Sequence, residues 1–173
     1  MNHVILITGL GSSIPFIGRI WTAWARKLEN RFKAHFKGRK DITITRVSAD
    51  GNGEAKALNL LRRDKTNGTL GKVAIIGHSN GFRDGLNMAA SIRNSPIDFF
   101  GGIDMTLGEF GAQAYGNIKL FHEYHAQLAY ANFHHTFDKS NHHIWEIRKD
   151  HTAAASDRFV QNNIFGNVVK VME

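Results

Sequence analysis

The chain has 173 residues, of which 42% are hydrophobic and 10% aromatic, enough for one buried core but short for two domains. It contains no cysteine, which excludes a disulfide framework, a thiolate metal site and a cysteine nucleophile. The formal net charge of +7 raises the question of anionic partners, but the sequence has no recognisable nucleic-acid-binding module, and we expect no nucleic-acid partner.

The N-terminus carries no recognisable targeting signal. Residues 1–3 contain no Lys or Arg, and the apolar run at 4–7 is too short for the hydrophobic region of a signal peptide. No segment approaches the roughly 20 apolar residues of a membrane span. We therefore expect a cytoplasmic protein without a transmembrane segment, unless another system exports it.

The first part of the chain alternates strands with helices. An apolar strand is predicted at 4–7, followed by a loop of small residues at 9–13 and a long amphipathic helix from 17 to about 38. Within this helix Leu28, Phe32 and Phe36 recur at helical spacing, so the many basic residues between 26 and 40 are expected to face water. A β-branched strand at 42–47 and a second helix around 55–61 come next, ended by the Thr-Asn-Gly turn at 66–68.

The second part continues the alternation. Strands are predicted at 73–76, 97–105, 118–124 and 143–147, with helices at 82–93 and 156–172. Strands that alternate with helices at this spacing favour a mostly parallel sheet covered on both faces. The fold class is therefore α/β, a three-layer α/β/α sandwich forming a single domain over residues 1–173.

The most informative stretch joins the strand at 73–76 to the helix at 82–93 through Gly77-His78-Ser79-Asn80-Gly81. This is a G-x-S-x-G nucleophile elbow, a sharp strand-to-helix turn that presents the serine hydroxyl. Glycine is required on both sides because a side chain there would collide where the chain doubles back. Ser79 is thus a candidate nucleophile, and His78 is expected to shape the pocket rather than act as a base.

With this elbow in its strand–turn–helix context, the chain resembles a minimal α/β-hydrolase of the lipase and esterase type over nearly all its length. In that family the triad follows the chain order serine, acid, histidine, each after a strand. The resemblance implies Ser79 as nucleophile, Asp104 as acid and His151 as general base ahead of the final helix. Asp138, one strand later, is the alternative acid.

The resemblance also implies an oxyanion hole and an ester substrate. The backbone N–H groups of Asn80 and Leu10 would hold the oxyanion, and Gly9 and Gly11 would let the first loop approach closely. Only about a dozen residues follow Asp104 before the next strand, which leaves little room for a lid. The implied activity is hydrolysis of carboxylic esters through an acyl-enzyme, and the positive charge would suit an ester carried on an anionic polymer or surface.

Three alternative functions differ from ester hydrolysis in the residues that they require. No nucleotide cofactor is expected, because the third glycine of a G-x-G-x-x-G loop is replaced by Ile14. A metal-dependent hydrolase could use the histidine clusters, but His122 and His125 would lie on opposite faces of a strand, so no metal is expected. The clusters comprise His122, Glu123, His125, His134, His135, His142 and His143. A non-catalytic binding protein on the same fold is the remaining alternative.

Overall fold

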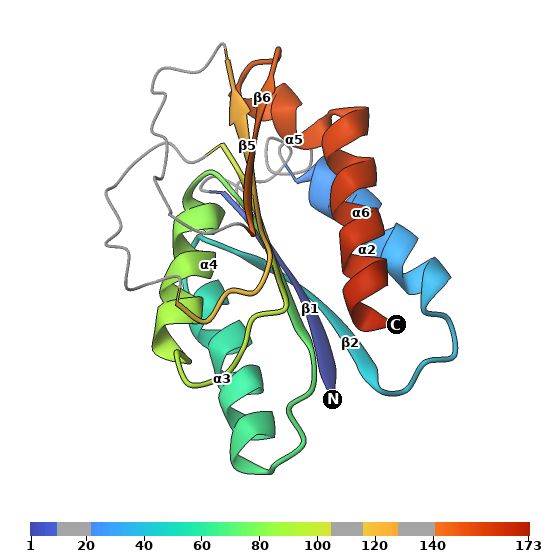
Figure 1. Ribbon diagram of the computed structural model, residues 1–173, viewed down its shortest axis with the longest axis vertical. Helices are drawn as coiled ribbons and strands as arrows, with labels where there is room; N and C mark the ends of the chain where they lie inside the picture. The colour runs from blue at the N-terminus through green and yellow to red at the C-terminus, as the bar shows by residue number, and fades with distance from the viewer. Residues whose placement is uncertain (10–21, 105–115, 128–140) are drawn as a thin grey trace.

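The computed structural model describes residues 1–9, 22–104, 116–127 and 141–173. Within these residues six strands form one sheet in the order β2-β1-β3-β4-β5-β6, and every neighbouring pair is parallel (Figure 1). The strands are β1 (Asn2–Thr8), β2 (Ile42–Ser48), β3 (Val73–His78), β4 (Phe99–Ile103), β5 (Phe121–Ala126) and β6 (His142–Ile147). The predicted α/β class with a mostly parallel sheet is confirmed.

Helices cover both faces of this sheet (Figure 1). One face packs against α2 (Ala23–His35), α5 (His151–Ser156) and α6 (Arg158–Met172), and the other against α3 (Gly53–Thr66) and α4 (Asn80–Ser91). The central strands β1 and β3 are apolar on both sides because both of their faces are buried. In α2 the predicted apolar residues Leu28 and Phe32 are fully buried, as is almost all of the following Phe36.

The bounds of the middle strands differ from the prediction. The strand expected at 97–105 is β4, which spans Phe99–Ile103. The strand expected at 118–124 is β5, which spans Phe121–Ala126. Ile97 and Ile118 meet only in an isolated bridge ahead of these strands. Asp98 explains the late start of β4, because its side chain accepts a hydrogen bond from the Val73 N–H at 2.9 Å and fixes the entry to the strand.

The C-terminal region also differs from the prediction. His151 was expected in a loop before one helix over 156–172, but it is the first residue of a separate helix, α5. Asp157 separates the two helices: its backbone is extended, with φ −60° and ψ 139°, and its side chain caps α6 by accepting from the Phe159 N–H. The candidate base is therefore carried by a short helix.

The strand order determines where a site can form. From β1 the sheet grows outward to β2 in one direction and to β3 in the other, so the order reverses between β1 and β3. In open parallel sheets, ligands bind outside the carboxyl ends of the strands at such a switch point. Gly9 follows β1 and Ser79 follows β3 at this place. No helix in the described ranges has both the length and the apolar composition needed to cross a membrane.

Candidate active site

Ser79 lies in a strained turn between β3 and α4. Its φ of 58° and ψ of −127° fall where residues with a side chain are uncommon. The turn is held by its own backbone, since the Ser79 N–H donates to the Ile103 carbonyl at 2.9 Å and the Ser79 carbonyl accepts from the Phe82 N–H at 3.0 Å. Such strain persists only where the surrounding structure enforces it. Ser79 is partly exposed between buried neighbours, so its side chain can be reached from outside.

The glycines of the elbow lie where no side chain fits. A Cβ on Gly77 would collide with the backbone of Gly81, and a Cβ on Gly81 with the carbonyl of Ile7 at the end of β1. The first turn of α4 therefore packs directly against the β1 backbone. Gly9 lies close to Ser79: a Cβ on Gly9 would be 2.9 Å from the Ser79 Cβ and 3.3 Å from its Oγ.

Replacing Gly81 by alanine is expected to destabilise the protein by about 1–3 kcal/mol, because backbone atoms cannot move aside as a flexible side chain would. Urea unfolding measures the loss. Gly166→Ala is the matched control: Gly166 is exposed in α6, nothing lies within 4 Å of the added Cβ, and we expect unchanged or slightly higher stability. Equal stability of Gly81→Ala and the wild type would contradict the close packing.

Asp104 and His151 form a hydrogen-bonded pair at the end of β4. The His151 Nδ1–H donates to Asp104 Oδ2 at 2.6 Å, and the other carboxylate oxygen accepts from the Ala126 N–H at 3.0 Å. The Asp104 side chain is 2% exposed and that of His151 30% exposed. With its proton on Nδ1, the neutral imidazole keeps Nε2 free of hydrogen, and this is the form that can take a proton from a nucleophile.

Asp104 has the second strained backbone of the described residues, with φ 40°. Its N–H donates to the Tyr124 carbonyl at 2.8 Å, which extends the pairing of β4 with β5 by one residue. The Ser79 N–H is bonded to Ile103, the last residue of β4, and Asp104 follows Ile103 directly, so the end of β4 places both the candidate nucleophile and the candidate acid. Aspartate tolerates a left-handed conformation better than most residues, which suits it to this position.

The ring of His78 packs against the ring of His151. The two rings stack with centroids 4.6 Å apart and an angle of 30° between their planes. The His78 Nε2–H donates to the backbone carbonyl of His151 at 3.0 Å. Burial lowers the pKa of His78 to about 4, so the ring is neutral at pH 7 and does not place a second positive charge beside His151.

The candidate oxyanion donor Asn80 is the buried first residue of α4. The first N–H groups of a helix have no acceptor within that helix, and the positive end of the helix dipole favours an anion there. The remaining candidates Leu10 and Gly11, together with the alternative acid Asp138, lie outside the described residues. The described part of the candidate site therefore contains one candidate oxyanion donor, the candidate nucleophile Ser79 and the Asp104–His151 pair.

The histidine-rich strands β5 and β6 place their side chains on both faces, as the strand periodicity predicted. His122 donates to Asn163 at 2.9 Å beside α6, whereas the buried Glu123 contacts His125 at 3.2 Å and His142 at 2.9 Å on the opposite face. Burial lowers the pKa of His125, but the hydrogen bond and charge of Glu123 outweigh it and raise the pKa above its ordinary value.

Among the described residues, no group of three or more histidine, aspartate or glutamate side chains is arranged to hold a metal ion. His134 and His135 lie outside the described ranges. Glu123, His125 and His142 form a buried cluster in which His142 hydrogen-bonds to Glu123 at 2.9 Å.

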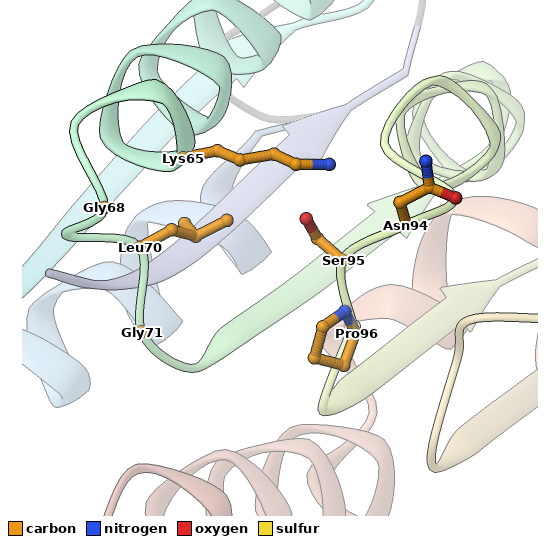
Figure 2. A pocket seen from close by; sticks show the side chains of 7 residues that line it. All are labelled: Lys65, Gly68, Leu70, Gly71, Asn94, Ser95 and Pro96. Atoms are coloured by element: carbon orange, nitrogen blue, oxygen red, sulfur yellow. The ribbon is translucent and has the colours of Figure 1, made fainter.

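A pocket of about 220 Å³ lies at the opposite edge of the sheet (Figure 2). It is formed by the end of α3 and by the segments that lead into β3 and β4, and hence by the amino ends of these strands. In Figure 2, Lys65 and Leu70 face Asn94, Ser95 and Pro96 across it. Ser79 lies at the carboxyl end of β3, so this pocket is separate from the candidate site.

Two contacts of the site were not predicted from the sequence, namely the Ala126 N–H on Asp104 and the His78 bond to the His151 carbonyl. Both join segments that are remote in the chain, so no local pattern indicates them. Comparison of the chain with models of known protein families and with curated protein sequences gives no match.

Proposed function

We propose that the protein is a serine hydrolase of the α/β-hydrolase type that cleaves carboxylic esters through Ser79, His151 and Asp104. The observation that carries the proposal is the buried Asp104 bonded to the His151 Nδ1, with His78 stacked on His151 directly before the strained turn of Ser79. A serine hydroxyl is a weak nucleophile until an imidazole takes its proton, and a carboxylate must orient that imidazole. The described residues include each of these three groups.

In the proposed reaction, His151 Nε2 accepts the Ser79 proton as the Oγ attacks the ester carbonyl. The negative charge formed on the carbonyl oxygen is held by the Asn80 N–H and by the loop after β1, where Leu10 is the second donor. His151 then returns the proton to the departing alcohol, which leaves an acyl group on Ser79. Water, activated by the same imidazole, releases the acid and restores the serine.

Asp104 has two parts in this proposal. It keeps the imidazole proton on Nδ1, and its negative charge stabilises the imidazolium formed in each half-reaction. Because Asp104 is almost fully buried, that charge acts at short range with little screening by water. The bond from the Ala126 N–H offsets part of the cost of burying the carboxylate.

The substrate in this proposal is an acyl ester. The net charge of +7 would attract an ester carried on an anionic polymer or surface and raise its rate of encounter. Such attraction is screened by salt, so the dependence of kcat/KM on ionic strength separates anionic from neutral esters.

The direct test is labelling with a fluorophosphonate probe followed by mass mapping of the modified residue. The probe phosphonylates an activated serine, and we expect the label on Ser79. The heat-unfolded protein is the control, because it has the same serines without the site. A label on another residue would reject Ser79 as the nucleophile, and the absence of any label would reject the proposal and favour a non-catalytic binding protein.

The proposed reaction uses three side chains and backbone N–H groups, so prolonged treatment with EDTA is expected to leave ester hydrolysis unchanged. The rate is measured with p-nitrophenyl acetate before and after dialysis against the chelator. Loss of activity that Zn²⁺ restores would favour a metal-dependent reaction through the histidine clusters.

A further inference from the structure

We propose that His78 is a positioning residue that aligns His151 with Ser79, an inference that rests on the proposed hydrolase function. His78 contacts His151 in two ways, through its ring on the imidazole and through its Nε2–H on the backbone carbonyl. The ring contact fixes the plane of the His151 imidazole, and the hydrogen bond fixes the backbone that carries it.

The helix that carries His151 is too short to be stable alone. It has six residues, and isolated helices of this length are marginal in water. Hydrogen bonds from outside hold its two ends: Asp150 accepts from the Ala153 N–H at 2.8 Å, and the Gln161 side chain donates to the Ala155 carbonyl at 2.7 Å. The His78 bond is made to the backbone carbonyl of His151.

His78 is a rigid support because of its surroundings. It ends the buried strand β3, and Trp24 packs its ring edge-on at 5.9 Å. It also directly precedes Ser79, so the bond to His151 ties the helix of the base to the turn of the nucleophile. Movements of the two reacting groups are thereby coupled through one residue.

The neutral state of His78 keeps this support compatible with turnover. Its low pKa leaves one proton on the ring, and the carbonyl of His151 requires that proton on Nε2. A cationic ring at this distance would oppose the positive charge that His151 takes on in the reaction.

The test compares His78→Phe, which retains a flat ring but no donor, with His78→Gln, whose amide nitrogen lies the same number of bonds from the backbone as Nε2. We expect His78→Phe to lower kcat by about 10- to 100-fold with KM unchanged, because a small misplacement of a catalytic group has effects of this size. His78→Gln should recover most of this loss. His122→Phe is the matched control, since His122 is also buried with a pKa of about 4 and a side-chain hydrogen bond, and it should keep the wild-type kcat.

Two outcomes would overturn the inference: a wild-type kcat in His78→Phe, or equal losses in His78→Phe and His78→Gln. A second measurement requires no variant. Nitrogen NMR of the wild type should show neutral His78 with its proton on Nε2 between pH 5 and 8, and a proton on Nδ1 instead would remove the donor and refute the role.

The NMR signals also separate this inference from the proposed function. The His151 Nδ1 proton bonded to Asp104 should exchange with water faster in His78→Phe than in the wild type and His78→Gln. This result is expected whether or not Ser79 reacts with the fluorophosphonate. Failure of labelling with intact NMR effects would reject the hydrolase proposal alone, whereas labelling with unchanged proton exchange would reject the role of His78.

Discussion

Replacing Ser79 by alanine is expected to lower the turnover of p-nitrophenyl acetate by several orders of magnitude, as removal of a triad nucleophile generally does. In the proposed reaction the Ser79 hydroxyl forms the acyl-enzyme, and alanine has no group that can carry the acyl chain. Alanine has the same backbone cost as serine at φ 58°, so the variant should fold as the wild type does. Pre-steady-state kinetics should show the acyl-enzyme burst in the wild type alone.

The control for this substitution is Ser91→Ala. Ser91 is exposed at the end of α4, the helix that Ser79 precedes, and the variant should keep full activity. Undiminished hydrolysis by folded Ser79→Ala would show that another residue performs the reaction.

Changing Asp104 to asparagine should lower turnover by about 10⁴ while leaving the protein folded. The Ala126 N–H can only donate, so the asparagine must turn its oxygen toward Ala126 and its NH₂ group toward His151. The imidazole then has to accept at Nδ1, which moves its own proton to Nε2, where it cannot take one from Ser79. Asparagine also tolerates the left-handed backbone at this position, so little stability is lost. The rate and the His151 tautomer can be measured on the same sample.

Asp138→Asn is the comparison variant for the acid. If Asp138 only caps a turn, its change should lower stability by on the order of 1 kcal/mol and keep most of the rate. The reverse pair of results, an active Asp104→Asn and an inactive Asp138→Asn, would assign the acid to the later segment and leave the serine hydrolase proposal standing.

Several features of the fold were predictable because a short sequence pattern marks each of them. The central strands β1 and β3 are continuous apolar runs, since helices cover both of their faces. The elbow between β3 and α4 was predicted because a close backbone approach admits only glycine at Gly77 and Gly81. Each pattern is recognisable within a few consecutive residues, although Gly81 itself meets Ile7 of the remote strand β1.

The separate helix α5 was not predicted from the sequence, which indicates only small residues beside His151 when the capping residues are overlooked. Asp150 and Asp157 are good capping residues, and a run of three alanines between them favours helix. That signal was available. The hydrogen bonds that hold Asp104 and His151 could not be predicted from the sequence. They depend on the register of β4 against β5 and on the packing of α5 over β3.

The order of Ser79, Asp104 and His151 along the chain has a consequence for synthesis. Ser79 and Asp104 leave the ribosome well before α5 and α6, and domains begin to order from the N-terminus as they are made. A nascent chain can therefore form the elbow while the proposed base is still absent. In the proposed reaction, hydrolysis would begin only when α5 docks, so a growing polypeptide that has not yet released this helix from the ribosome is catalytically silent.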